Sequence, residues 1–78
     1  MSAPATSTTP YKIVSDLNLP QAKDLLRRLG AVERPAYRTA ARSLHWAGTL
    51  KIWVECVPSS LARYGQTYTL NLYRGCPC

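Results

Sequence analysis

Four basic or ionisable side chains recur at helical spacing in the middle of the chain: Arg34, Arg38, Arg42 and His45. If residues 35–46 form a helix, each residue turns it by about 100°, so these four side chains share one face. No acidic residue lies between Glu33 and Glu55. Arginine neutralises phosphates and can bridge guanine O6 and N7. The stripe therefore predicts binding to a polyanion, for which nucleic acid is the most common candidate.

The overall charge favours the same partners. The chain of 78 residues has 10 Lys and Arg against 4 Asp and Glu, which gives a net charge of +6. A helix lying on a membrane would carry bulky apolar residues opposite its charges, whereas residues 35–46 offer mostly alanine. No run approaches the roughly 18 apolar residues of a membrane span. We expect nucleic acid, or an acidic protein surface, and no membrane partner.

Three cysteines bear on metal chemistry and on compartment: Cys56, Cys76 and Cys78. An odd number cannot pair completely within one chain, which argues against a secreted disulfide framework. We expect free terminal thiols and a cytoplasmic protein of a prokaryote or of a phage-infected host. His45 completes a set of three cysteines and one histidine, but Cys76 and Cys78 lack the two-residue spacer of structural zinc sites. We therefore expect no metal and no other cofactor.

The acidic residues give no support for catalysis. Asp24 is spaced to pair with Arg28 at i, i+4 on a helix, and Glu55 is placed to face a Lys or Arg across a hairpin. The chain has no glycine-rich phosphate loop, no nucleophile elbow and no set of paired carboxylates. We expect a protein that is not an enzyme.

Composition divides the chain into three parts. Residues 1–10 are small residues, threonine, serine and proline after the methionine, and such a segment cannot bury enough apolar area to offset its ordering entropy. We expect a flexible N-terminal tail over residues 1–10, a single small domain over 11–75 and a C-terminal tail over 76–78.

The first half of that domain has a short strand and a clear helix. Residues 11–14 are a short β-prone run. Residues 19–29 carry leucine and alanine at steps of three and four, which is typical of a helix with one apolar face. Asn18 is placed to cap this helix, Pro20 is tolerated in its first turn, and Gly30 ends it.

The second half predicts another helix and a hairpin. Pro35 stands where a helix would begin, and the arginine spacing carries that helix to residue 46. A strand over residues 37–46 is the competing interpretation, but its two faces would mix polar and apolar residues, so the helix is preferred. Residues 50–57 and 67–73 alternate as strands do. Residues 58–66 are expected to form a protruding loop between them.

The resulting fold class is α+β: a short strand, two helices and then a two-stranded antiparallel hairpin. This order resembles the winged helix-turn-helix superfamily over about two thirds of the chain, from residues 19–30 through 35–46 to the hairpin. The resemblance implies that the second helix enters the major groove and that the hairpin forms a wing. It assigns these residues to the nucleic-acid or partner-binding face: Arg34, Arg38, Thr39, Arg42 and His45 in the helix, and Arg63 and Tyr64 in the wing. The same order also resembles KH-type RNA-binding domains, but Gly30 to Glu33 lacks the second glycine of their GXXG loop.

Two functions follow from these expectations. The first is a small DNA-binding protein, a repressor or an accessory factor, that reads duplex DNA and acts as a homodimer because one small helix reads only a few base pairs. The second is a small phage-type inhibitor or adaptor that presents the same basic face to a host protein. Two tryptophans and five tyrosines also raise the possibility of stacking on unpaired bases, although Trp46 and Trp53 are expected to pack.

Overall fold

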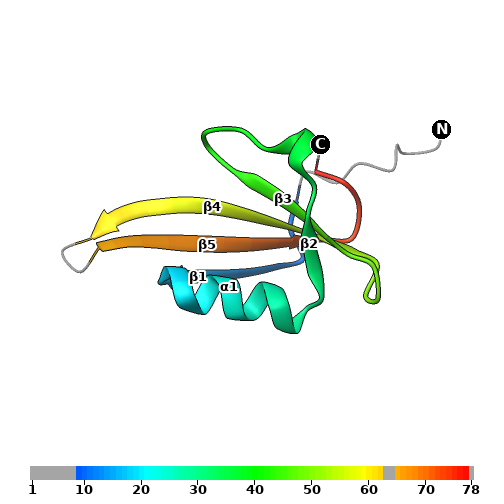
Figure 1. The fold of residues 1–78 in the computed structure, drawn as a ribbon, viewed down its shortest axis with the longest axis horizontal. Helices are drawn as coiled ribbons and strands as arrows, with labels where there is room; N and C mark the ends of the chain where they lie inside the picture. Colours follow the sequence, from blue (N-terminus) through cyan, green and yellow to red (C-terminus); the bar gives the residue numbers. More distant parts are fainter. Residues whose placement is uncertain (1–8, 63–64, 78) are drawn as a thin grey trace.

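The protein is a five-stranded antiparallel sheet with one α-helix packed on one of its faces (Figure 1). The computed structural model describes the backbone of residues 9–62 and 65–77, and the side chains of those residues except 60–62. The elements in chain order are β1 (Lys12–Leu17), α1 (Leu19–Arg28), β2 (Ala31–Glu33), η1 (Pro35–Tyr37), β3 (Ser43–Ala47), β4 (Ile52–Ala62) and β5 (Gly65–Tyr73), where η1 is a single 3-10 turn.

The strand order β1-β5-β4-β3-β2 corrects the expected architecture. The predicted architecture of a short strand, two helices and a two-stranded hairpin is wrong, because the described residues form five strands and only one α-helix. The first two strands lie at opposite edges of the sheet, and α1 crosses between them along one face (Figure 1). The sheet, and not a helical pair, is therefore the scaffold that positions the functional side chains.

The helix α1 confirms its prediction, and local interactions explain its ends. Asn18 Oδ1 accepts a hydrogen bond from the Gln21 backbone N–H at 2.8 Å, and Gln21 Oε1 accepts one from the Asn18 N–H at 3.0 Å. This reciprocal pair satisfies two N–H groups that the first turn leaves without partners. Past the other end, Gly30 has φ of 69°, a left-handed conformation that glycine adopts without strain.

The main core lies between α1 and the sheet. Val54 pairs with Leu72 and Cys56 with Leu70 across β4 and β5, so alternate residues of both strands point toward the helix. The fully or nearly fully buried members of this core are Ala47, Ile52, Val54, Leu70 and Leu72. Partly buried side chains of β1, α1, β2 and β4 pack against them: Val14, Leu17, Leu25, Leu26, Leu29, Ala31 and Cys56.

The opposite face of the sheet, here the helix-free face, is also partly covered. Leu44 is fully buried there. The covering element is η1, whose Tyr37 ring packs edge-on against Trp53 with ring centroids 5.9 Å apart. Trp46 lies beside Trp53 at 5.1 Å. The backbone N–H of Arg34 donates to the Leu44 carbonyl at 2.8 Å and holds η1 in place.

The helix predicted over residues 35–46 is wrong. Residues 35–37 form the 3-10 turn η1, residues 38–42 form a link without regular structure, and β3 follows. That strand pairs with β4 on one side and β2 on the other, and its residues are buried or half-buried on both faces. Mixed polarity on the two faces therefore does not exclude a strand here, which is the reason that the sequence pattern misled.

The loop predicted over residues 58–66 is also wrong, because β4 and β5 continue through most of it. Ala62 still pairs with Gly65, and the ladder shifts register between Pro58 and Leu61. The β3 ladder ends at the pair of Ser43 with Cys56, so β4 has a free edge beyond that point and tolerates a proline. The predicted wing-tip residues Arg63 and Tyr64 lie outside the described residues.

Candidate functional site

The arginine stripe does not form one face. Arg34 precedes η1 with an exposed side chain. Arg38 has extended backbone, and its Nη1 lies 3.3 Å from Glu33 Oε2. Arg42 instead reaches the helix-free face, where its Nη1 lies 2.6 Å from Glu55 Oε2. Residues 40 and 41 bend the chain between Arg38 and Arg42, where the Thr39 backbone N–H donates to the Arg42 carbonyl at 2.9 Å. The link therefore separates residues that a helix would have aligned.

Glu55 is the buried centre of a polar network on the helix-free face. It is 8% exposed and accepts hydrogen bonds from Arg42 Nη1 at 2.6 Å, Asn71 Nδ2 at 3.0 Å and the Tyr73 hydroxyl at 3.0 Å. Burial acts to raise the pKa of Glu55, but these hydrogen bonds outweigh it and hold the pKa below its ordinary value. The cation opposite Glu55 thus comes from the link, and not from across a hairpin as predicted.

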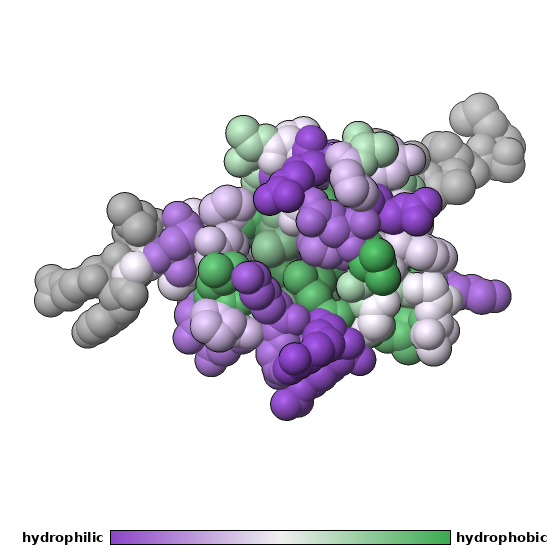
Figure 2. Space-filling view, in the orientation of Figure 1, coloured by the Kyte–Doolittle hydropathy of each residue, from purple (hydrophilic) through white to green (hydrophobic). Residues whose placement is uncertain are grey.

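A cleft opens on the other face, between α1 and the sheet. Its volume is about 250 Å³, and its lining residues come from α1, the link and three strands: Leu19, Ala22, Lys23, Leu26, Arg38, Ser43, His45, Cys56 and Tyr68. A smaller hollow of about 140 Å³ shares four of these residues and adds Thr39, Ala40, Arg42 and Pro58. Figure 2 shows the molecule from this side, with apolar surface in a hollow between two hydrophilic rims.

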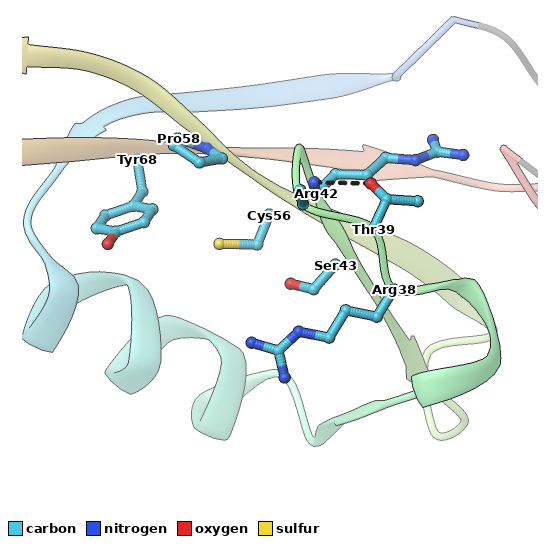
Figure 3. Close-up of a pocket in the computed structure, with 8 residues that line it drawn as sticks. Arg38, Thr39, Arg42, Ser43, Cys56, Pro58 and Tyr68 are labelled. Atoms are coloured by element: carbon cyan, nitrogen blue, oxygen red, sulfur yellow. Dashed lines mark hydrogen bonds between the residues drawn. The ribbon is translucent and has the colours of Figure 1, made fainter.

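The side chains that line the hollow come from separate elements (Figure 3). Tyr68 of β5, Cys56 of β4 and Ser43 of β3 point to the helix side of the sheet, and the Arg38 guanidinium extends from the link toward α1. Arg42 points away, toward its partner on the helix-free face. The cleft therefore has one cation from the link, Arg38, and one from the helix, Lys23.

The inner polar groups of the cleft are neutral. His45 Nε2 and Ser43 Oγ lie 3.1 Å apart, two residues along the same strand face. Burial lowers the pKa of His45, with Glu33 opposing that shift and Arg38 adding to it. Burial also raises the pKa of the Cys56 thiol, against a smaller opposing effect of Ser43. At neutral pH the cleft thus presents an uncharged imidazole, a hydroxyl and a thiol, all able to exchange hydrogen bonds with a ligand.

The structure brings together only part of the predicted site. Arg38 and His45 line the cleft, Thr39 and Arg42 line the adjoining hollow, and Arg34 lines neither. Thr39 Oγ1 accepts hydrogen bonds from the backbone N–H groups of Ala41 and Arg42, both at 3.2 Å, and so shapes the link. The prediction missed Lys23, Ser43, Cys56 and Tyr68. Their shared face depends on strand register across β3, β4 and β5, and no local pattern in the sequence carries that information.

Metal binding has no support among the described residues, where no three His, Cys, Asp or Glu side chains cluster. Cys56 is a free thiol. Cys76 is disulfide-bonded, so the prediction that it is a free thiol is wrong. Cys78 lies outside the described residues.

The fold and cleft define a small basic α+β domain, in which one helix and an antiparallel sheet enclose a cleft that two cations flank. No family model, no curated protein and no solved structure matches the chain. In the described part of the chain, no helix has the length and apolar character needed to cross a membrane. The function must therefore be argued from the cleft itself.

Proposed function

We propose that the protein binds nucleic acid at the cleft, with Lys23 and Arg38 contacting phosphates. The observation that supports this most directly is the placement of these two cations on separate elements around one cleft. A net charge of +6 on 78 residues attracts a polyanion over long range and so raises its encounter rate. The proposal keeps the partner expected from the sequence and moves its binding site from an arginine-striped helix to the cleft.

Lys23 and Arg38 are more available to an external anion than Arg42 is. Lys23 has no ion pair with a carboxylate among the described residues. The Arg38 side chain is 66% exposed, and its contact with Glu33 at 3.3 Å lacks hydrogen-bond geometry. Glu33 Oε2 is buried and has no hydrogen-bond partner, so the exposed Arg38 guanidinium keeps its N–H donors available to a phosphate. Arg42, by contrast, is held by Glu55.

A protein partner is the second candidate. In that case this protein would be an inhibitor or adaptor that recognises an acidic surface of its partner. Large apolar residues are exposed at both sheet edges, with Ile13 of β1 59% exposed and Val32 of β2 65% exposed. Just before β1, the Tyr11 ring lies with its centroid 4.8 Å from the Arg74 guanidinium. Arginine and aromatic residues are enriched in protein interfaces.

Fluorescence anisotropy with labelled single-stranded DNA, single-stranded RNA and duplex DNA at several salt concentrations tests the proposal. We expect Lys23→Gln/Arg38→Gln to weaken binding at least tenfold. If both side chains contact phosphates of a single strand, the logarithm of the association constant should fall less steeply with the logarithm of the salt concentration in this variant, with a slope shallower by about 1.4. The control is Arg34→Gln/Lys51→Gln, which removes the same charge from exposed sites outside the cleft.

Equal losses in the two double variants would show that only net charge matters and would overturn the cleft as the site. Affinity weaker than about 100 µM, the weak end of non-specific binding, for all three nucleic acids would overturn the function. The acidic protein partner would then be the better candidate.

A further inference from the structure

We infer that the cleft accepts one unpaired nucleobase, stacked on Tyr68, while the phosphates that flank it lie at Lys23 and Arg38. This inference rests on the proposed nucleic-acid binding and goes beyond it, because it specifies a single strand and names the group that enters the cleft. Three properties of the lining support it: the size and walls of the cleft, the distribution of charge, and the aromatic ring.

The walls of the cleft suit a small planar group. One wall is the apolar side of α1, formed by Leu19, Ala22 and Leu26, and Tyr68 belongs to the sheet side. The volume of about 250 Å³ falls below the roughly 300–1,000 Å³ typical of pockets for drug-sized ligands. A space of this size and lining takes one ring system and not a longer ligand. Stacking on an aromatic face is the usual way in which proteins hold an unpaired base.

The charge distribution separates the inside of the cleft from its rims. The inner polar groups are the hydroxyl of Ser43, the imidazole of His45 and the thiol of Cys56, and all three are neutral at neutral pH. Neutral donors and acceptors match the edge of a base, which carries both kinds of group. The cations Lys23 and Arg38 match phosphates instead. A nucleotide has the same order of groups, with a neutral base on one side of the sugar and charge on the other.

Paired bases do not meet these requirements. A base in a duplex is stacked on both faces and hydrogen-bonded along its edge, and removing it costs a few kcal/mol. A single strand avoids this cost, so the cleft should prefer unpaired nucleic acid to duplex.

The test compares a short oligothymidylate with an abasic strand of equal length and charge, and with a duplex of the same length. We expect the wild-type protein to bind the oligothymidylate more tightly than either of the other two. Tyr68→Leu should weaken oligothymidylate binding by roughly 5- to 150-fold, the effect of losing one stacked base, and leave abasic binding unchanged. Tyr11→Leu is the matched control, because Tyr11 is exposed and lies outside the cleft. Circular dichroism checks that both variants fold.

A second measurement uses the unmodified protein, so it does not depend on a variant that folds. The Cys56 thiol lines the cleft, and its alkylation by iodoacetamide can be followed at that peptide by mass spectrometry. We expect saturating oligothymidylate to slow alkylation at least fivefold and the abasic strand to leave it unchanged.

The outcomes separate the two proposals. Equal affinity for the abasic strand and the oligothymidylate, with alkylation of Cys56 unaffected, would overturn the base pocket and leave nucleic-acid binding intact. Tighter binding to the duplex would do the same. Absence of binding to every strand would overturn both.

Discussion

Arg42 and Glu55 form an ion pair on the helix-free face, with Nη1 and Oε2 2.6 Å apart, although they lie 13 positions apart in the chain. The pair ties the link over residues 38–42 to the middle of β4. Its side chains are only 31% and 11% exposed, so both charges are partly removed from water. The pair therefore joins two elements and takes one arginine out of the set available to an external anion.

Removal of the arginine should destabilise the fold. Arg42→Ala leaves the carboxylate of Glu55 partly buried without its cation, and we expect the free energy of unfolding to fall by about 2–3 kcal/mol, below the loss for a fully buried pair. Arg34→Ala, an exposed arginine in the same segment, should change it by less than about 0.5 kcal/mol. Urea denaturation measures both. Equal effects would mean that the ion pair contributes nothing specific.

Stability should decline in acid, and Glu55 should be one cause. Its hydrogen bonds lower its pKa in the folded protein, so the unfolded chain binds the proton more readily. The resulting stabilisation is complete above the ordinary carboxyl pKa, about 4.3, and is lost as pH falls through the lowered value.

Glu55→Gln should flatten the pH dependence of the unfolding free energy below about pH 4, measured by urea denaturation at a series of pH values. A second decline in the unfolding free energy, near the pKa of an ordinary histidine, should remain in this variant. Burial lowers the pKa of His45 in the folded protein, so protonation of this imidazole favours the unfolded chain. An acid limb that is as steep in Glu55→Gln as in the wild type would contradict the role of Glu55.

The capping pair at the start of α1 should be measurable in the whole protein. Asn18→Ala removes the acceptor of the Gln21 N–H and should lower stability by about 1 kcal/mol. Asn18→Asp retains an acceptor at that position and should stay within a few tenths of a kcal/mol of wild type. Thermal unfolding followed by circular dichroism distinguishes the two. Equal melting temperatures for Asn18→Ala and Asn18→Asp would argue that the cap does not limit stability.

The helix-free face should behave as a second core. Leu44 is fully buried there, so Leu44→Ala should lower the free energy of unfolding by about 2–4 kcal/mol. Val32→Ala, on the neighbouring edge strand β2 and 65% exposed, should lower it by less than about 0.5 kcal/mol. Guanidinium denaturation provides the measurement. A loss below 1 kcal/mol for Leu44→Ala would show that η1 does not seal this face.

Elements whose signals are local could be predicted from the sequence. The capping residue Asn18, the apolar spacing of residues 19–29 and the terminating Gly30 lie within one helix, and the helix formed as expected. The Asp24 carboxylate contacts Arg28 Nε at 2.9 Å as predicted, and it also contacts Arg27. Alternation located the first half of β4 and most of β5, though not their full length.

The segment from Gly30 to Ala47 could not be predicted in this way. Its arginines have helical spacing, yet β3 lies between two strands and gains hydrogen bonds along both edges. Residues 31–33, for which no strand was predicted, become β2 because they complete that pairing. A strand covered on both faces lacks the alternation that identifies a half-buried one, so the periodic charge was the stronger signal and the wrong one.

The sequence by itself determined the basic charge of the protein, the position and ends of α1, and the presence of strands near the C-terminus. These depend on composition and on contacts between residues three or four apart. Tertiary structure alone decided that Arg38 and Arg42 lie on opposite sides of the sheet, and that Lys23, Ser43, Cys56 and Tyr68 share one cleft. The physical reason is that strand register sets which distant side chains become neighbours, and register follows from the packing of the whole sheet against α1.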